Sequence, residues 1–377
     1  MRYDFIFSGM GLSSLMILHK MIQSDLCSGK DILIIEAEKE KHNDRTWCFW
    51  EKGEGRWDSL LKKRWEQAYF VADDIKVNCL KDGYEYKMLE SKSFYDLVLN
   101  EISQNDRIQV VHEKMVSFSE KEDFVWIVTE ENHYEANYFF NSVLNKSEFI
   151  ENIRYPLLQQ HFAGWFVRSE SAVFDDNKAV FMDFSVGQKG NTRFMYVLPV
   201  SAREALVEYT LFSPDLIAQG EYEIEIEGYL KSQGIAEFTI VAKEKGNIPM
   251  TAYPFWNKNS KRTLYIGTAG GWTKASTGYT FKNSDKLSDR VIGRVKVGKI
   301  DFRDFKKAER FTFYDSLFVK VLFGENSIGK NLFTGMFSKV SPEKILRFLD
   351  EESSIVEEIE IIWACPKWPF IKALFKK

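Results

Sequence analysis

Near the start of the chain, two short apolar runs flank a segment with helical spacing. Residues 3–7, apolar except for Asp4, and the apolar residues 32–35 each predict a β-strand. Between them, Leu15, Leu18 and Ile22 recur at helical intervals, which predicts a helix over residues 12–22. This order of strand, helix and strand is typical of a βαβ unit in a parallel sheet.

A glycine turn joins the first strand to the helix. Gly9 and Gly11 let backbone N–H groups approach a phosphate, and the N-terminus of the helix favours its negative charge. Ser14 stands where the usual fingerprint has a third glycine, and its small side chain still permits close packing of helix on strand. Glu36 ends the second strand, where an acid accepts hydrogen bonds from ribose hydroxyls. A two-glycine turn alone is weak evidence, but this order of elements predicts a site for an adenine dinucleotide.

Farther along the chain, alternation of apolar and polar residues replaces the helical spacing. The segments 124–129 and 138–140 predict a β-ribbon inserted into the first sheet. Longer strands follow and predict an antiparallel sheet in a second domain, over residues 163–167, 180–184, 193–199 and 206–212. A helix over residues 221–233 then ends at Gly234, a typical C-terminal cap.

The last third of the chain indicates a return to the first domain. Residues 263–271 predict a strand that runs into a glycine-rich turn, and the part from residue 285 onward is expected to be mostly helical. We therefore predict an α/β fold, with a Rossmann-like nucleotide-binding domain and an α+β substrate domain. The predicted division is residues 1–70, 95–150 and 260–300 for the nucleotide, residues 71–94 and 151–259 for the substrate, and a helical part over residues 301–377.

Composition and charge narrow the possible partners. The 377 residues, 45% of them hydrophobic, suffice for two cores. A net charge of -4 provides no broad basic field, so nucleic acid is not expected as a partner. No uncharged run approaches the roughly 18 to 20 residues of a membrane-spanning helix. Asp4 interrupts any apolar leader, so no signal peptide is expected.

Cysteine, histidine and aromatic residues set further limits. The four cysteines lie far apart without a C-x-x-C pair, and the five histidines show no metal-ligand spacing. We therefore expect no metal site and no disulfide framework, and a reducing cytoplasm suits such cysteines. Aromatic residues make up 15% of the chain, and those beyond the core suit a large apolar pocket or a membrane surface.

Glu208 is the leading candidate for acid–base chemistry. Alternation along its strand places it on one face with Leu206, Thr210 and Phe212. On an apolar face, burial would raise the pKa of its carboxyl and make it a proton donor near neutral pH. On the opposite face it would be a solvated strand residue, and the pattern leaves both interpretations open. Asp183, on an earlier strand, raises the same question.

Small residues gather again late in the chain. They are Gly267, Thr268, Ala269, Gly270 and Gly271, and Thr277 and Gly278 extend the loop. Such a turn lets a pyrophosphate or a flavin approach the backbone, and a tight turn with positive φ is the alternative. Arg45 precedes an aromatic segment, where it would pair with a cofactor phosphate or a flavin edge, or form a surface salt bridge.

Ordered motifs along the chain carry a resemblance to a known family. They are residues 43–51 (NDRTWCFWE), 160–162 (QHF) with 164–165 (GW), 181–183 (FMD), 194–199 (FMYVLP), 208–210 (EYT), 267–271 (GTAGG) and 276–281 (STGYTF). Over essentially its whole length, the chain resembles the bacterial lycopene beta-cyclases, flavoproteins of carotenoid synthesis. Ser14 departs from the family pattern, as does Ala275, where the family often has proline.

The resemblance implies a particular fold and reaction. The fold is that of the aromatic hydroxylases, with an FAD domain and a β-sheet substrate domain. In the implied reaction, a proton is added to the terminal double bond of a ψ-end of lycopene, the ring closes, and a proton is lost to leave a β-ring, by way of gamma-carotene to beta-carotene. Reduced FAD acts on the cationic transition state, and NADPH or NADH keeps it reduced. Glu208 matches the catalytic glutamate of the family.

The implied substrate, lycopene or a related ψ-ended carotenoid, dissolves in a bilayer and not in water. The resemblance therefore implies a cytoplasmic protein that associates peripherally with the inner membrane, and no obligate protein partner is inferred. The aromatic and basic tail, residues 363–377, is typical of an interfacial anchor, and packing against the second domain is the alternative.

Two other functions stay open at the level of the sequence. A flavin hydroxylase or polyprenyl reductase on the same fold would consume one nicotinamide per product. A non-catalytic carotenoid or lipid binder would be indifferent to the loss of Glu208.

Overall fold

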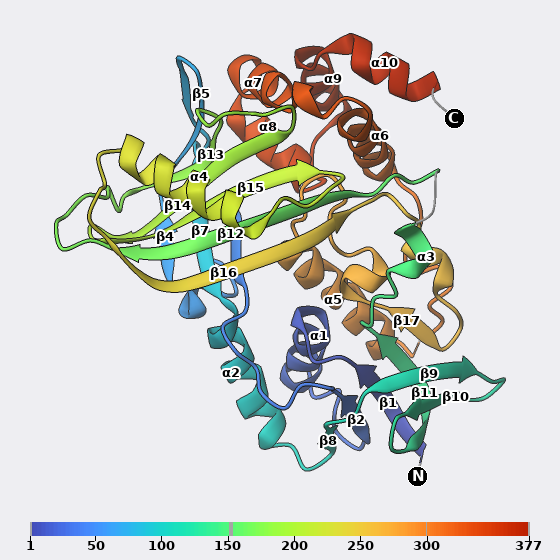
Figure 1. Ribbon diagram of the computed structural model, residues 1–377. Coiled ribbons are helices and arrows are strands. Elements are labelled where there is room, and N and C mark those ends of the chain that lie inside the picture. Colours follow the sequence, from blue (N-terminus) through green and yellow to red (C-terminus); the bar gives the residue numbers. More distant parts are fainter. Residues whose placement is uncertain (1, 151–153, 299, 376–377) are drawn as a thin grey trace.

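The computed structural model describes residues 2–150, 154–298 and 300–375, which form three β-sheets and the helices that cover them (Figure 1). The first sheet has the order β8-β2-β1-β11-β10-β9, and β17 pairs with β11. Its strands are β1 (Arg2–Ser8), β2 (Ile32–Ile35), β8 (Ile108–Val111), β9 (Met115–Glu120), β10 (Val125–Thr129), β11 (His133–Asn141) and β17 (Thr263–Tyr265). The pairs β8-β2, β2-β1, β1-β11 and β11-β17 are parallel, whereas β9 and β10 form an antiparallel ribbon.

Helices α1 (Leu12–Gln23), α2 (Ser91–Ser103) and α5 (Phe281–Lys296) pack with this sheet in one core, together with Phe7, Ile34 and Trp272. The parallel pairing of β17 with β11 shows that the chain returns to the first domain, as the sequence predicts. The predicted α/β class with a Rossmann-like domain is therefore confirmed. The inserted ribbon is formed by β9 and β10, whereas residues 138–140, which were expected in the ribbon, lie in β11 and pair in parallel with β1.

The second sheet has the order β16-β12-β15-β14-β13-β5-β6. Its strands are β5 (Gln67–Ala72), β6 (Ile75–Asn78), β12 (Leu158–Arg168), β13 (Lys178–Asp183), β14 (Thr192–Ser201), β15 (Glu204–Ser213) and β16 (Thr239–Met250), all antiparallel to their neighbours except for the parallel pair β13-β5. Helix α4 (Gln219–Ser232) covers one face of β12 and β15, where Tyr209, Ile226 and Leu230 share a core.

The opposite face of the second sheet meets a small third sheet and the C-terminal helices. The third sheet, in the order β3-β7-β4, consists of β3 (Thr46–Lys52), β4 (Lys63–Trp65) and β7 (Tyr84–Glu90). The remaining helices are α3 (Ser147–Ile150), α6 (Arg310–Gly324), α7 (Gly329–Lys339), α8 (Pro342–Leu349), α9 (Ile355–Ala364) and α10 (Lys367–Phe375), with short 3₁₀ turns η1 (Asp58–Leu60), η2 (Phe255–Lys258), η3 (Gly267–Gly270) and η4 (Asn326–Ile328). One aromatic core, which includes Trp50, Tyr86, Phe181, Phe212 and Phe337, joins these parts. We call it the central core.

Several elements lack a counterpart in the sequence expectations, among them β3, α2 and β16. The aromatic segment after Arg45 is strand β3, and neither α2 nor β16 was predicted. Strand β16 is a sheet edge whose outward side chains are exposed, so that its apolar alternation is weak. The expected boundary between residues 70 and 71 falls inside β5, and the division into domains stays a prediction.

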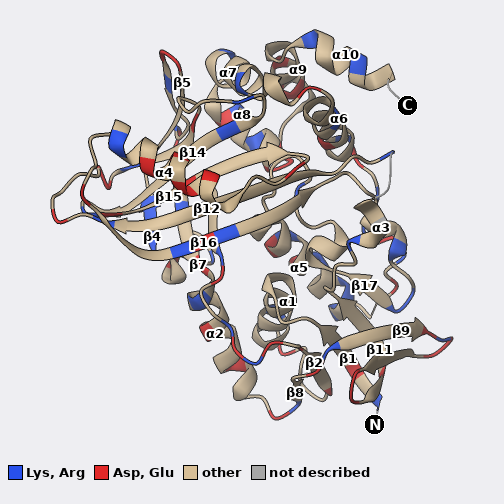
Figure 2. Cartoon of the chain, in the orientation of Figure 1, with Lys and Arg blue, Asp and Glu red and all other residues tan. Residues whose placement is uncertain are grey.

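Helices α9 and α10 carry large apolar side chains that are exposed to solvent. Trp363, Trp368 and Phe375 are 66%, 73% and 82% exposed. Figure 2 shows α10 as a helix with basic segments on an otherwise uncharged ribbon. Across the part of the chain that the structure describes, no helix combines the length and hydropathy needed to span a membrane.

Candidate active site

The glycine turn between β1 and α1 exposes backbone N–H groups to open space. Gly9 has φ +85°, and a Cβ there would lie 2.2 Å from the Ser142 Oγ, so a side chain would be strained and crowded. Gly11 precedes α1 without any side-chain cap, and a Cβ on it would meet no atom within 4 Å. The unpaired N–H groups at the start of α1 are therefore available to an anionic ligand.

Glu36 lies beside this turn as a hydrogen-bond acceptor. Its Oε2 accepts the backbone N–H of Met10 at 2.8 Å and an N–H of Lys41 at 2.7 Å. Burial works to raise the pKa of Glu36, but hydrogen bonds from Lys41 and from the backbone of Glu38 and Met10 hold that pKa below its usual value. The carboxylate is ionised and ready to accept hydroxyl donors.

The second small-residue turn lies against the first. Gly267 has φ +58°, and a Cβ on it would lie 3.3 Å from the Oγ of Ser13, in the first turn of α1. At Gly270 a Cβ would lie 2.0 Å from the Tyr265 carbonyl oxygen, so that only glycine fits. Ala269 is fully buried beside it. The two turns, more than 250 residues apart in sequence, thus form one surface of backbone and small side chains.

Ser14, the departure from the usual fingerprint, is fully buried in α1. Its Oγ has no hydrogen-bond partner within the described residues. The residue therefore takes the closely packed position that the sequence argument assigns to a small side chain.

The loop around Thr277 and Gly278 reaches from the second turn to the second sheet. Gly278 has φ +71°, and a Cβ on it would lie 2.2 Å from the Gln160 Oε1 on β12. The N–H groups of Thr277 and Gly278 donate to the Lys274 carbonyl at 3.3 and 2.8 Å. Gln160 and Gly164 are four residues apart on one face of β12, or about 13 Å. The nucleotide turns therefore lead onto the face of the sheet that carries Glu208, which pairs with Gly164.

Glu208 faces the central core from the middle of the second sheet. On β15, Leu206 and Phe212 belong to that core, whereas Val207 and Tyr209 pack under α4. Glu208 is therefore on the face of Leu206 and Phe212, and it is 8% exposed. Of the two arrangements that the alternation allowed, the structure therefore has the one with Glu208 on an apolar face.

The surroundings of Glu208 favour its protonated form. Its carboxyl accepts a hydrogen bond from the Thr210 hydroxyl and shares another with the carboxyl of Glu244 on β16. Burial raises the pKa of Glu208 well above its usual value, and the negative charge of Glu244 raises it further. A neutral acid is therefore held on an apolar face.

Aromatic rings lie in the core that the acid faces. Tyr196 is the direct neighbour of Glu208 on β14, and its hydroxyl bonds to that of Tyr86. The Trp50 ring lies edge-on to Tyr279 and Phe181, with centroids 4.9 and 6.2 Å apart. Aromatic faces stabilise a nearby cation and exclude water, which would quench one.

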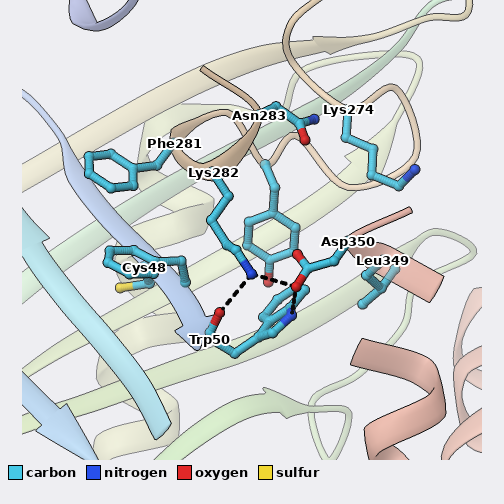
Figure 3. Close-up of a pocket in the computed structure, with 10 residues that line it drawn as sticks. Cys48, Trp50, Lys274, Phe281, Lys282, Asn283, Leu349 and Asp350 are labelled. Atoms are coloured by element: carbon cyan, nitrogen blue, oxygen red, sulfur yellow. Dashed lines mark hydrogen bonds and ion pairs between the residues drawn. The ribbon is translucent and has the colours of Figure 1, made fainter. Parts of the chain in front are cut away.

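A cavity of about 20 Å³ opens where β3 meets the loop that ends at Phe281 (Figure 3). Cys48, Trp50 and Tyr279 line it from the central core, and Lys282 lines it from α5. Figure 3 shows Lys282 pointing to the Trp50 carbonyl, at 3.0 Å, and to Asp350, whose Oδ2 also accepts the Trp50 indole N–H at 2.8 Å. These bonds fix β3 against α5 and the C-terminal part.

The two remaining candidates lie apart from Glu208. The Asp183 carboxylate accepts the Tyr229 hydroxyl of α4 at 2.8 Å and the Ser185 N–H at 2.8 Å, so it belongs to the opposite, helix-covered side of the sheet. Arg45 is half-exposed at the start of β3, where its guanidinium donates to the Asp44 carbonyl at 2.6 Å. The structure brings Arg45 near Glu244, which its charge stabilises, but it does not bring Asp183 to Glu208.

Sequence reasoning missed Glu244. In residues 243–247, KEKGN, the exposed lysines flank a partly buried glutamate. That alternation was present in the sequence, but it lies in an edge strand that was not predicted.

Solved structures with a similar fold include a reductase-like protein and a halogenase that was solved with FAD. A geranylgeranyl bacteriochlorophyll reductase-like protein from Thermoplasma acidophilum has a TM-score of 0.62 at 11% identity and covers 99% of this chain and 98% of its own. The halogenase PltM, in complex with phloroglucinol and FAD, has a TM-score of 0.58 at 11% identity, over 98% of this chain and 87% of its own. At such identity the similarity concerns the fold alone, a mixed α/β architecture with a Rossmann-like nucleotide domain.

The sequence comparisons define the family. The family model described as lycopene cyclase protein matches residues 4–375, so the chain belongs to that family. A lycopene beta-cyclase of Pantoea ananas is 22% identical over 307 residues, 77% of this chain and 74% of that protein. A lycopene beta-cyclase of Paracoccus sp. is 27% identical over 126 residues, which is 31% of either chain. The family resemblance seen in the motifs is therefore confirmed.

Proposed function

We propose that the chain is a lycopene beta-cyclase, which closes the ψ-ends of lycopene into β-rings without net oxidation or reduction. Membership of the lycopene cyclase family supports the substrate class. The observation that carries the proposal is Glu208, an acid held neutral on the aromatic face of the second sheet. Such an acid is suited to protonate a carbon–carbon double bond in a site without water.

Glu208 would act as the proton donor. Its carboxyl gives a proton to the terminal double bond of the ψ-end, and the electron pair of a second double bond then forms the new ring bond. A proton leaves a ring carbon to give the double bond of the β-ring, so the protein gains and loses one proton per ring. Tyr86, Tyr196 and Trp50 would stabilise the intervening cation through their ring faces.

The turns around α1 and η3 suit FAD. The open space above Gly11 accepts a pyrophosphate, and the ionised Glu36 accepts ribose hydroxyls. The small-residue surface of Gly267–Gly270 leads toward the second sheet, so a flavin bound there would point to the central core. Bound and kept reduced by NADPH or NADH, FAD would supply negative charge near the developing cation.

The exposed aromatic residues of α9 and α10 would place the protein on a membrane surface. Lycopene has to be drawn from a bilayer, and Trp363, Trp368 and Phe375 are free to enter the boundary between lipid and water. We infer peripheral association with the cytoplasmic side of the inner membrane.

The test is the Glu208→Gln variant in an anaerobic assay. Purified protein is incubated with lycopene in liposomes, FAD and NADPH, and carotenoid products and NADPH are measured together. The unchanged protein should form beta-carotene without matching loss of NADPH, and Glu208→Gln should lose at least about 100-fold in rate. Product that tracks NADPH mole for mole would point to a reductase or hydroxylase, and a variant with full activity would contradict the role of Glu208.

Thermal unfolding is the control for this variant. The pKa of Glu208 is raised in the folded protein, so the unfolded chain releases that proton at lower pH and the folded state loses stability as the pH rises above about 4.5. Glutamine removes that loss. Glu208→Gln should therefore unfold at the same or a higher temperature at pH 7.5, which separates lost chemistry from lost folding.

A further inference from the structure

Glu244 and Glu208 lie on either side of one glycine. Gly164 on β12 pairs with Glu208 on β15 and with Glu244 on β16, so the three residues form one row across the sheet. All three lie on the face of the central core, because Lys243 and Lys245 point outward. A Cβ on Gly164 would lie 3.5 Å from the Glu208 Cβ and 3.2 Å from the Glu244 Cγ. The glycine therefore leaves the space in which the two carboxyls meet.

The hydrogen bonds of the pair assign the proton. A hydrogen bond between two carboxyls requires that one of them is protonated, because two carboxylates have only acceptors. Burial raises the pKa of Glu244 as well, but its Oε2 already accepts the Thr46 hydroxyl at 2.8 Å, and both this bond and the charge of Arg45 counteract that rise. Glu208 is the more buried of the two and has no basic neighbour of its own in the described residues. The proton thus resides on Glu208 and the negative charge on Glu244.

Few other groups near the pair change charge. The Cys48 thiol and the Tyr196 hydroxyl face it from β3 and β14, and burial raises the pKa of each, so both stay neutral. Glu90, at the end of β7, is the other acid that acts on Glu244, and it forms an ion pair with Lys62 at 3.5 Å. The pair itself therefore dominates the local titration.

We propose that Glu244 is a positioning residue that forms a single acid pair with Glu208 across Gly164 and holds the acid proton there between turnovers. The proposal rests on the proposed function, in which Glu208 alone touches the substrate. When Glu208 gives its proton to the double bond, two adjacent carboxylates remain, and their repulsion draws back the proton that the ring releases. One proton leaves the pair and one returns for each ring, with no change of oxidation state.

The primary test measures the proton without any substrate. Infrared spectra of the purified full chain should contain a protonated carboxyl band at pH 7 that Glu208→Gln removes. In Glu244→Gln, which keeps the shape but loses the charge, the midpoint for loss of that band should fall by about one pH unit or more. Glu244→Asp keeps the charge and should keep most of the elevation. The control is Glu204→Gln, the same change at a residue of β15, the strand of Glu208. Glu204 pairs with Arg168, and its replacement should leave the midpoint unchanged.

The activity profile gives the second readout. Because Glu208 must be protonated, the rate of cyclisation falls as the pH rises through its pKa. Glu244→Gln should shift this alkaline limb of the pH profile to lower pH, by as much as it shifts the infrared midpoint. An equal midpoint in Glu244→Gln and the unchanged protein, or no band that depends on Glu208, would overturn the pair. If the band shifts as stated but lycopene is never cyclised, the pair stands and the proposed function fails. If both proteins cyclise lycopene with identical pH profiles, the proposed acid pair is overturned and the proposed function still stands.

Discussion

At the scale of single residues, glycine decides where ligands and side chains meet. Gly11 leaves open space at the start of α1, where a Cβ would meet no atom within 4 Å, and Gly164 leaves space for two carboxyls. The φ of Gly11 is -91°, which any residue adopts, so this glycine is needed for access and not for backbone conformation. Access and folding can therefore be separated at Gly11.

The Gly11→Ala variant should fold normally and bind FAD at least about tenfold more weakly, because the new methyl group occupies the space of the pyrophosphate. The measurement is quenching of flavin fluorescence during titration, with thermal unfolding of the ligand-free protein as the check on folding. Gly293→Ala is the matched control, since its Cβ also meets no atom within 4 Å but lies on the exposed side of α5. Equal FAD affinity in the two variants would contradict a phosphate site at Gly11.

At the scale of elements, one buried lysine holds the loop between η3 and α5 in place. Lys274 is 4% exposed, and its Nζ lies 3.1 Å from the Asp315 carboxylate of α6 and 2.9 Å from that of Glu351. The Ser276 hydroxyl also donates to the Asp315 carboxylate, at 2.6 Å. Burial raises the pKa of Asp315, and Lys274 counteracts that rise. The loop that bears Thr277 and Gly278 is thus held by a desolvated ion cluster.

Lys274→Met should reduce the free energy of unfolding by about 3 to 5 kcal/mol, because it leaves a buried carboxylate without its cation. Urea unfolding at pH 7 measures the change. The control is Lys330→Met, which removes the partner of Asp73, a residue 72% exposed; this loss should be below about 1 kcal/mol. Losses of similar size in the two variants would show that burial does not increase the contribution of the Lys274 ion cluster to the free energy of unfolding.

At the scale of the whole molecule, the central core lies between the second sheet, the small third sheet and the C-terminal helices (Figure 1). Helix α10 contributes to this packing through Phe370 and the buried Ala373, while Trp368 and Phe375 stay in solvent. The tail therefore has a packed side and an exposed side. The packing that was the alternative expectation is thus observed for part of the tail, whereas the interfacial anchor stays a proposal. Because of this packing, removing residues 363–377 would also disturb the core.

Substitution tests membrane docking more sharply than deletion. The triple variant Trp363→Ser, Trp368→Ser, Phe375→Ser should bind vesicles that contain acidic phospholipid at least about tenfold more weakly, because the groups that enter the interface are lost. Sedimentation with vesicles measures binding, and activity on detergent-dispersed lycopene should fall much less.

The matched control for docking replaces three apolar residues that are similarly exposed but lie outside α9 and α10. Serine at Val116, Ile224 and Val297, which are 61%, 69% and 74% exposed, should leave vesicle binding unchanged. Equal losses of binding and activity in the tail variant, or weakened binding in this control, would contradict docking through α9 and α10.

Local signals in the sequence determined the nucleotide half of the protein. Apolar periodicity predicts the bounds of β2 and the start of α1, and Glu36 is predicted from its place directly after β2. These features can be predicted because each depends on residues close in sequence. Strand alternation likewise grouped Glu208 with Leu206 and Phe212. It could not choose the face, because a strand with apolar residues on both sides gives no sign of which side the core of a second sheet will cover.

Only the tertiary structure decided which distant residues share a site. Glu244 stands on an edge strand with weak alternation, and its pairing with Glu208 depends on strand order and on register across Gly164. Asp183 raised the same question as Glu208 in the sequence, yet the helix that covers its side of the sheet gives it Tyr229 as a partner instead. Periodicity reports which residues are buried, whereas the pKa of an acid depends on the charges that the fold brings to it.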